Sequence, residues 1–98
     1  MDSDILLALK KVIDPELGIN VVDLGLVCRA THTSNAIEVE LAMTSPACPL
    51  GETMVEEATL ALQERFPDAS SIRVQLIRDL PWTPDRMTEE GRRQLGLS

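Results

Sequence analysis

Two stretches of alternating apolar residues, 26–31 and 36–43, are separated by the short polar segment "HTSN". Alternation with period two is typical of a half-buried strand, and two such strands around a short turn predict an antiparallel hairpin. If Thr31 pairs with Ala36, the same register sets Arg29 against Glu38, a favourable cross-strand pair. The apolar residues then share one face: Leu26, Cys28 and Ala30 lie opposite Leu41, Val39 and Ile37.

The rest of the chain predicts three helices and one further strand. Helical spacing of apolar residues predicts helices over residues 4–13, 49–66 and about 88–95, and alternation in "SIRVQLIR" predicts a strand over residues 71–78. Asp2 or Ser3 can cap the first helix, and Asp85 or Thr88 the last. The predicted fold class is α/β (α+β), a small mixed three-stranded sheet in the order helix, strand, strand, helix, strand, helix.

Length and composition restrict the kind of protein. The 98 residues predict a single domain over residues 1–98, and the net charge of -7 argues against nucleic acid or an anionic membrane as a partner. We find no secretory signal at the start of the sequence and no apolar run long enough to cross a membrane. Two cysteines allow neither a disulfide framework nor a complete zinc site in one chain, so we expect a protein of the reducing cytoplasm.

The topology predicts that several unusual residues lie at one end of the sheet. A strand–helix–strand crossover is right-handed and leaves its two strands parallel. The end of the second strand, the end of the third strand and the start of the first then meet at one edge, where ligands of α/β sheets usually bind. We therefore expect a common site formed by six residues: Asp14, Glu16, Asp23, Thr44, Cys48 and Trp82.

Cys48 stands between two prolines in "TSPACPLG", at the predicted start of the second helix. With Pro49 at the first helical position, Cys48 becomes the N-cap, where free backbone amides and the helix dipole favour thiolate over thiol. Nearby acidic side chains oppose that effect. Cys48 is thus either a reactive thiol or a small residue that caps a helix, and the residue types alone leave both interpretations open.

The other cysteine and the single histidine have simpler interpretations. Cys28 falls on the apolar face of the predicted hairpin, which predicts a packed, unreactive thiol and no disulfide bond with Cys48. His32 lies in the turn at the far end, too distant to act as the base of a Cys48 dyad. Trp82, the only tryptophan, is either a lid over the edge of the core or an anchor for a protein partner.

Two acids and two hydroxyls accompany Cys48 in the predicted site. Asp14 and Glu16 can bind a metal or orient a substrate, although an acidic turn around a proline also ends a helix. Thr44 and Ser45 can donate hydrogen bonds to an oxyanion or to cluster sulfides, or can satisfy the backbone at the strand end.

Three stretches together, "DPELGINVVDLGLV", "MTSPACP" and "DLPWTPDRMTEEGRRQLG", resemble a known family. They are similar to the small iron-sulfur cluster assembly domains related to SufT and PaaD, whose eukaryotic relatives act in cytosolic iron-sulfur protein maturation. The resemblance covers residues 4–97. It implies an iron-sulfur assembly type of α/β domain, with the family's reactive cysteine at Cys48. Its acid and hydroxyl positions fall on four residues: Asp14, Glu16, Thr44 and Ser45.

The sequence departs from the family's pattern in two respects. Ser45 and Ala47 stand where relatives often have Thr and Gly, which leaves a hydroxyl at position 45. The cysteine-rich extension of PaaD-like members is absent, which favours a SufT-like role.

The resemblance implies an accessory factor in iron-sulfur cluster assembly, which works beside P-loop ATPase cluster carriers and apo client proteins. No P-loop is present in this sequence. One cysteine cannot provide the four ligands of a cluster, so Cys48 is expected to be a transient iron or cluster ligand, with the other ligands supplied by a second protomer or a partner. A thiol enzyme with Cys48 as nucleophile is an alternative, although no general base is evident. A pure adaptor with an inert Cys48 and a binding surface at Trp82 is another.

Overall fold

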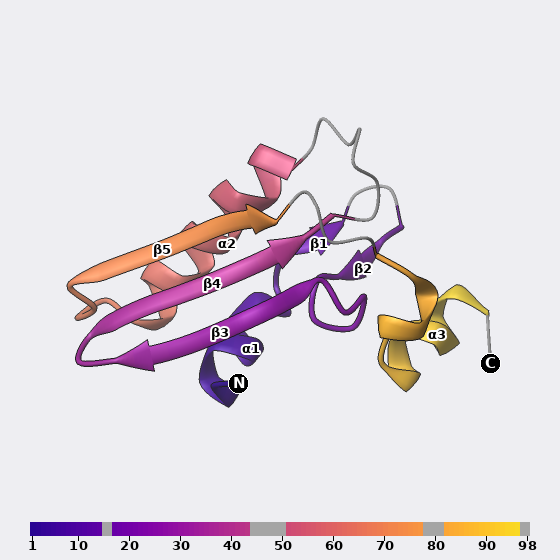
Figure 1. Ribbon diagram of the computed structural model, residues 1–98, viewed down its shortest axis with the longest axis horizontal. Coiled ribbons are helices and arrows are strands. Elements are labelled where there is room, and N and C mark those ends of the chain that lie inside the picture. The colour runs from indigo at the N-terminus through magenta and orange to yellow at the C-terminus, as the bar shows by residue number, and fades with distance from the viewer. Residues whose placement is uncertain (15–16, 44–50, 78–81, 97–98) are drawn as a thin grey trace.

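A three-stranded sheet with two helices behind it forms the body of the protein (Figure 1). The structure, a computed structural model, describes residues 1–14, 17–43, 51–77 and 82–96. Its elements are α1 (Ser3–Leu9), β1 (Ile13–Asp14), β2 (Ile19–Asn20), β3 (Val27–Thr33), β4 (Ala36–Ala42), α2 (Gly51–Arg65), β5 (Ser71–Ile77), the 3-10 helix η1 (Pro84–Arg86) and α3 (Glu89–Leu95). The strand order is β3-β4-β5, with β3 and β4 antiparallel and β4 and β5 parallel. The predicted fold class is confirmed.

The hairpin forms, but its predicted register is wrong by two residues. Thr33 pairs with Ala36, so that only Ser34 and Asn35 form the turn, and Ala30 rather than Cys28 lies opposite Val39. Ser34 and Asn35 have φ angles of 46° and 69°, and positive φ at both central residues matches the right-handed twist of the strands in a two-residue hairpin. The tighter turn therefore replaces the expected four-residue turn.

A register shift between Val27 and Arg29 is the second difference from the predicted hairpin. Such a β-bulge inserts one residue, and here it reverses the alternation of the strand before Arg29. Val27 is consequently buried opposite Leu41, whereas Cys28 is only half-buried and does not lie on the core face as expected. Arg29 lies opposite Glu40, yet its guanidinium still reaches Glu38 diagonally at 4.0 Å.

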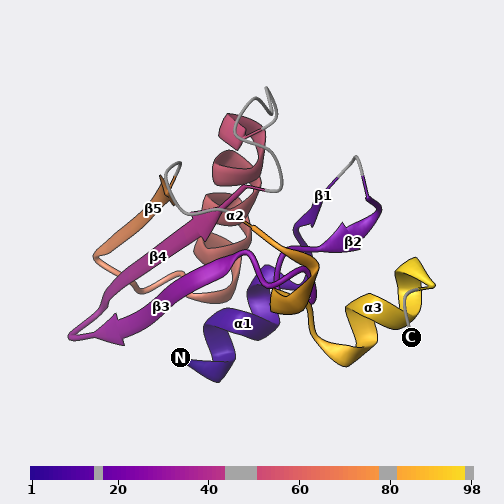
Figure 2. The same cartoon turned by 45° about the vertical axis from the view of Figure 1, so that its right-hand side comes forward.

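The crossover from β4 through α2 to β5 has the predicted parallel geometry. Ala36 pairs with Ser71 and Ala42 with Ile77 without interruption. Helices α1 and α2 cover the same face of the sheet (Figures 1 and 2). The core between these layers includes large side chains that are fully buried: Ile5, Leu9, Leu26, Ile37, Leu41, Met54 and Leu62.

The first helix is shorter than predicted. Asp2 caps it, since its carboxylate accepts from the Ile5 amide at 3.0 Å, but α1 ends at Leu9. Ile13 and Asp14 instead pair with Asn20 and Ile19 as β1 and β2. This small two-stranded ladder lies beyond the end of the main sheet, near α3 (Figure 2).

Candidate functional site

A loop of residues 21–26 joins the small ladder to the end of the main sheet. The Val21 amide donates to the Val12 carbonyl at 3.0 Å, and the Leu26 amide donates to the Val21 carbonyl at 3.0 Å. The Ala42 amide, at the end of β4, then donates to the Leu26 carbonyl at 2.7 Å. Three backbone segments, namely the chain before β1, the loop and the end of β4, thus meet at the carboxyl end of β4.

Asp23 is the centre of this loop and is only 7% exposed. Its carboxylate accepts from the Asn20 amide nitrogen at 2.7 Å and from the Thr88 hydroxyl at 2.8 Å. Its own backbone amide donates to the Asn20 side-chain oxygen at 2.9 Å, and its carbonyl accepts from the Thr88 amide at 2.9 Å. Both carboxylate oxygens are therefore used within the fold, one to hold Asn20 of β2 and the other to attach residues 82–96 to the loop.

Two glycines allow the C-terminal segment, defined here as residues 82–96, to approach this loop closely. Gly25 has a φ of +75°, and a Cβ at this position would overlap the backbone carbonyl of Arg86. A Cβ at Gly91, in the first turns of α3, would likewise overlap the carbonyl of Asp23. The contact is made between backbones and leaves no room for larger residues on either side.

Trp82 lies at the predicted end of the sheet. Its indole N–H donates to the Leu24 carbonyl at 2.6 Å, and its half-buried ring packs against the core. Leu24 comes shortly before β3 in the chain, so this contact lies at the start of β3, at the opposite end from the turn of Ser34 and Asn35. Asp23 and Trp82 therefore converge as expected.

The remaining predicted site residues are placed only in part. Asp14 ends β1 and is 1% exposed, and its carbonyl accepts from the Gly18 amide at 2.7 Å. Four other predicted residues lie outside the described part of the chain: Glu16, Thr44, Ser45 and Cys48.

The two residues that flank positions 44–50 are both at the carboxyl end of the sheet. Met43 is buried directly after β4, and Gly51 begins α2. A Cβ at Gly51 would lie 2.9 Å from Cδ1 of Leu76 and 3.1 Å from Cε of Met43. The start of α2 is thus packed tightly against the ends of β4 and β5, which places the positive end of its helix dipole at this edge of the sheet.

Cys28 has an environment that the sequence did not predict. Arg86, from η1, donates from Nη2 to the Cys28 sulfur at 3.5 Å, and the thiol lies 3.7 Å from the Leu26 carbonyl. Cys28 is a free cysteine. The bulge turns this side chain from the sheet core toward the C-terminal segment.

The contacts that hold the C-terminal segment are not among those predicted from the sequence, although two signals in the sequence point to them. Gly25 directly follows Asp23 and Leu24, and a glycine in a loop often marks a residue with positive φ or a place where two backbone segments approach closely. Thr88, one of two caps expected for the last helix, accepts from the Gly91 amide at 3.1 Å. The hydrogen bond from Thr88 to Asp23 joins residues that are far apart in the sequence, so local sequence patterns do not predict it.

Replacing Thr88 with valine tests this double role. The change keeps the shape but removes the cap of α3 and the hydrogen bond to the buried Asp23 carboxylate. We expect it to lower the free energy of unfolding by about 2 kcal/mol. Thr88→Ser, which retains the hydroxyl, should lower it by less than about 1 kcal/mol. Urea unfolding of both variants measures the difference, and equal losses would contradict the role of the hydroxyl.

Some kinds of site are absent from the described residues. Within residues 1–14, 17–43, 51–77 and 82–96, no three His, Cys, Asp or Glu side chains are grouped so that they could hold a metal ion. No helix in the same part of the chain has the length and apolar character needed to cross a bilayer.

Comparison with known proteins finds a family match over residues 2–76, to a model described as "Iron-sulfur cluster assembly protein". The Fe-S protein maturation auxiliary factor YitW of Bacillus subtilis is 33% identical over 98 residues, covering 99% of this chain and 95% of the relative. The auxiliary factor SufT of Staphylococcus aureus is 35% identical and covers 89% of this chain and 99% of its own length.

A larger relative and a solved structure add to these matches. An iron-sulfur cluster carrier protein of Synechocystis is 30% identical over 86% of this chain, which corresponds to only 24% of the carrier. The crystal structure of a DUF59 domain from Bacillus anthracis superposes with a TM-score of 0.90 at 32% identity, covering 98% of this chain and 92% of that one.

Proposed function

Because the chain belongs to the iron-sulfur cluster assembly protein family, we propose that it is an auxiliary factor that assists delivery or insertion of iron-sulfur clusters into client apoproteins. One observation supports this role above the others: the chain and YitW, named as an Fe-S protein maturation auxiliary factor, match over nearly their whole lengths.

Cys48 is the residue to which we assign the contact with the cargo. A thiolate is the preferred protein ligand of iron-sulfur clusters, and the start of α2 provides a positive dipole at this edge of the sheet. Thr44 and Ser45 would donate hydrogen bonds to cluster sulfides or to the sulfur of Cys48. Glu16 would orient the incoming cargo. The nearly complete burial of Asp14 favours a supporting role for its carboxylate over direct contact with cargo.

A single thiolate leaves a cluster short of ligands, because iron-sulfur clusters in proteins usually have four. We therefore propose that the cluster is cargo, bound only while a partner supplies the other ligands. The carrier protein of Synechocystis contains a region similar to this chain, which supports iron-sulfur cluster carriers as partners. We propose that these carriers are P-loop ATPases and that apo iron-sulfur proteins are the other partners. The exposed part of Trp82 is the proposed contact for one of them.

Complementation tests the proposed function. In a bacterium that lacks its own factor of this family, the chain should restore the cluster content of iron-sulfur enzymes, measured per enzyme polypeptide under iron limitation. We expect at least a severalfold increase over cells with an empty vector. Unchanged cluster content, with the chain present in normal amounts, would contradict the proposal.

A further inference from the structure

The two outer edges of the three-stranded sheet differ in how they are protected. At the β3 edge, the Asp2 amide donates to the Ala30 carbonyl at 3.0 Å, and the bulge at Cys28 interrupts the strand. At the β5 edge, the strand Ser71–Ile77 has no proline and no bulge, and its register with β4 is continuous. Among the described residues, none outside β4 makes a backbone hydrogen bond to residues 72–77.

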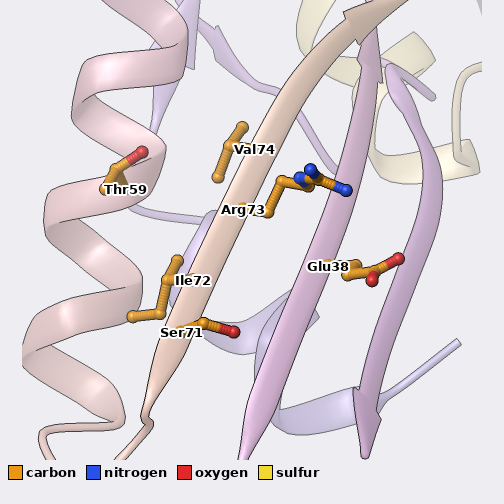
Figure 3. A pocket seen from close by; sticks show the side chains of 6 residues that line it. All are labelled: Glu38, Thr59, Ser71, Ile72, Arg73 and Val74. Atoms are coloured by element: carbon orange, nitrogen blue, oxygen red, sulfur yellow. The ribbon is translucent and has the colours of Figure 1, made fainter.

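An open groove of about 570 Å³ follows this unprotected edge. Thr59 of α2 lines it on one side and Glu38 of β4 on the other, with residues 71–74 of β5 between them (Figure 3). Ile72 and Val74 point toward α2, whereas Arg73 points across the opposite face of the sheet. The groove therefore reaches around the edge of β5, and α2 does not close it.

An edge strand whose outward amides and carbonyls find no partner, as those of residues 72–77 do within the described part of the chain, is a template for another strand. Natural edge strands are usually blunted by several charges, prolines or bulges. β5 has one charged residue, Arg73, and alternates it with half-buried apolar residues. The edge thus has the features of a pairing surface without the usual protection.

The sequence of β5 is complementary to itself about Val74. In an antiparallel pair of two copies centred there, Val74 faces Val74, Ile72 faces Leu76, and Arg73 faces Gln75 of the other copy. Within residues 72–76 every apolar residue meets an apolar residue, whereas Ile77 faces Ser71 at each end of the pair, and the two arginines are not opposite each other. A pair centred on Arg73 would oppose the two arginines, which destabilises a sheet.

We propose that β5 pairs antiparallel with β5 of a second copy, so that two three-stranded sheets join into one sheet of six strands. The self-complementary pattern favours a second copy as the partner, because one register sets Ile72 against Leu76 and Val74 against Val74, and opposes no like charges. The pairing is independent of the proposed function, and either can fail without the other.

Opposite charge changes at one position test this pairing. Gln75→Arg would place Arg opposite Arg twice in each dimer, and Gln75→Glu would create two Arg–Glu pairs. We expect the dissociation constant of the dimer to rise about tenfold in the first variant and to fall several-fold in the second. Sedimentation velocity over a concentration series at about 0.15 M salt, where long-range repulsion between the acidic chains is screened, measures both.

Two controls separate this effect from changes in folding or net charge. Gln75 pairs with Glu40 in the parallel register, so Gln75→Arg should slightly raise the melting temperature of the monomer while it weakens the dimer. Gln94→Arg adds the same charge on α3 and should leave the dissociation constant unchanged. A chain that stays monomeric at all concentrations would overturn the proposal. So would a dimer that responds to neither Gln75 variant, or to both in the same direction.

Discussion

The Cys48→Ser protein is expected to fold and accumulate normally but to leave iron-sulfur enzymes poorly loaded. Serine caps a helix at least as well as cysteine, so the free energy of unfolding should change by no more than about 1 kcal/mol. A hydroxyl at neutral pH is neither a soft-metal ligand nor a thiolate nucleophile. In the complementation strain, we expect cluster content close to that of the empty vector, with the larger deficit when iron is scarce.

Cys28→Ser is the matched control, because it makes the same atomic change at the other cysteine. The half-buried thiol of Cys28 contacts Arg86 and the Leu26 carbonyl, and a serine hydroxyl can serve both. We therefore expect nearly full complementation. Full client activity with Cys48→Ser would exclude the thiol mechanism and favour an adaptor that acts through Trp82.

The Gly25→Ala protein is expected to lose about 3 kcal/mol or more of its free energy of unfolding. The positive φ of +75° costs a side chain about 1 kcal/mol, and the added Cβ would overlap the backbone carbonyl of Arg86. Backbone atoms cannot rotate aside, so residues 82–96 must shift away from the loop. Urea unfolding measures the loss, and limited proteolysis should cut the C-terminal segment first.

Gly18→Ala is the control that separates the cost of a positive φ from the cost of the overlap between the new Cβ and the Arg86 carbonyl. Gly18 has a similar φ of +70°, but no atom lies within 4 Å of an added Cβ. We expect a loss of about 1 kcal/mol, from strain alone. Equal losses for the two alanine variants would mean that the close approach of Gly25 and Arg86 contributes little.

Local patterns predicted the elements that depend on local physics. Alternation identified β3, β4 and β5, and the right-handed crossover rule predicted that β4 and β5 are parallel. Cap chemistry limited each helix start to two candidates, and the actual caps, Asp2 and Thr88, are among them. These features depend on residues a few positions apart, so the sequence alone contains most of the information.

The errors arose where distant residues decide the local structure. The turn of Ser34 and Asn35 is tighter than its composition suggested, because strand twist favours two central residues with positive φ. The bulge at Cys28 coincides with a contact from Arg86, far along the chain, and neither can be read from alternation. β1 and β2 are each too short to show a pattern.

The candidate site was predictable in its location but only partly in its contacts. Topology alone brought Asp23 and Trp82 to the same end of the sheet. The partners of Asp23, by contrast, come from Asn20 and from Thr88 at the other end of the chain. Glu16, Thr44, Ser45 and Cys48 lie outside the described residues, so their assignment to the site remains a prediction.

The hydrogen bond between Trp82 and Leu24 makes the intrinsic fluorescence of the protein a probe of how the C-terminal segment is attached. The chain has one tryptophan and no tyrosine, so its near-ultraviolet fluorescence comes almost entirely from this one indole. The emission wavelength of an indole depends on its contact with water, and this ring is half-buried where the C-terminal segment joins the loop. Unlabelled protein therefore reports the attachment of that segment directly, while far-ultraviolet circular dichroism follows the sheet and helices separately.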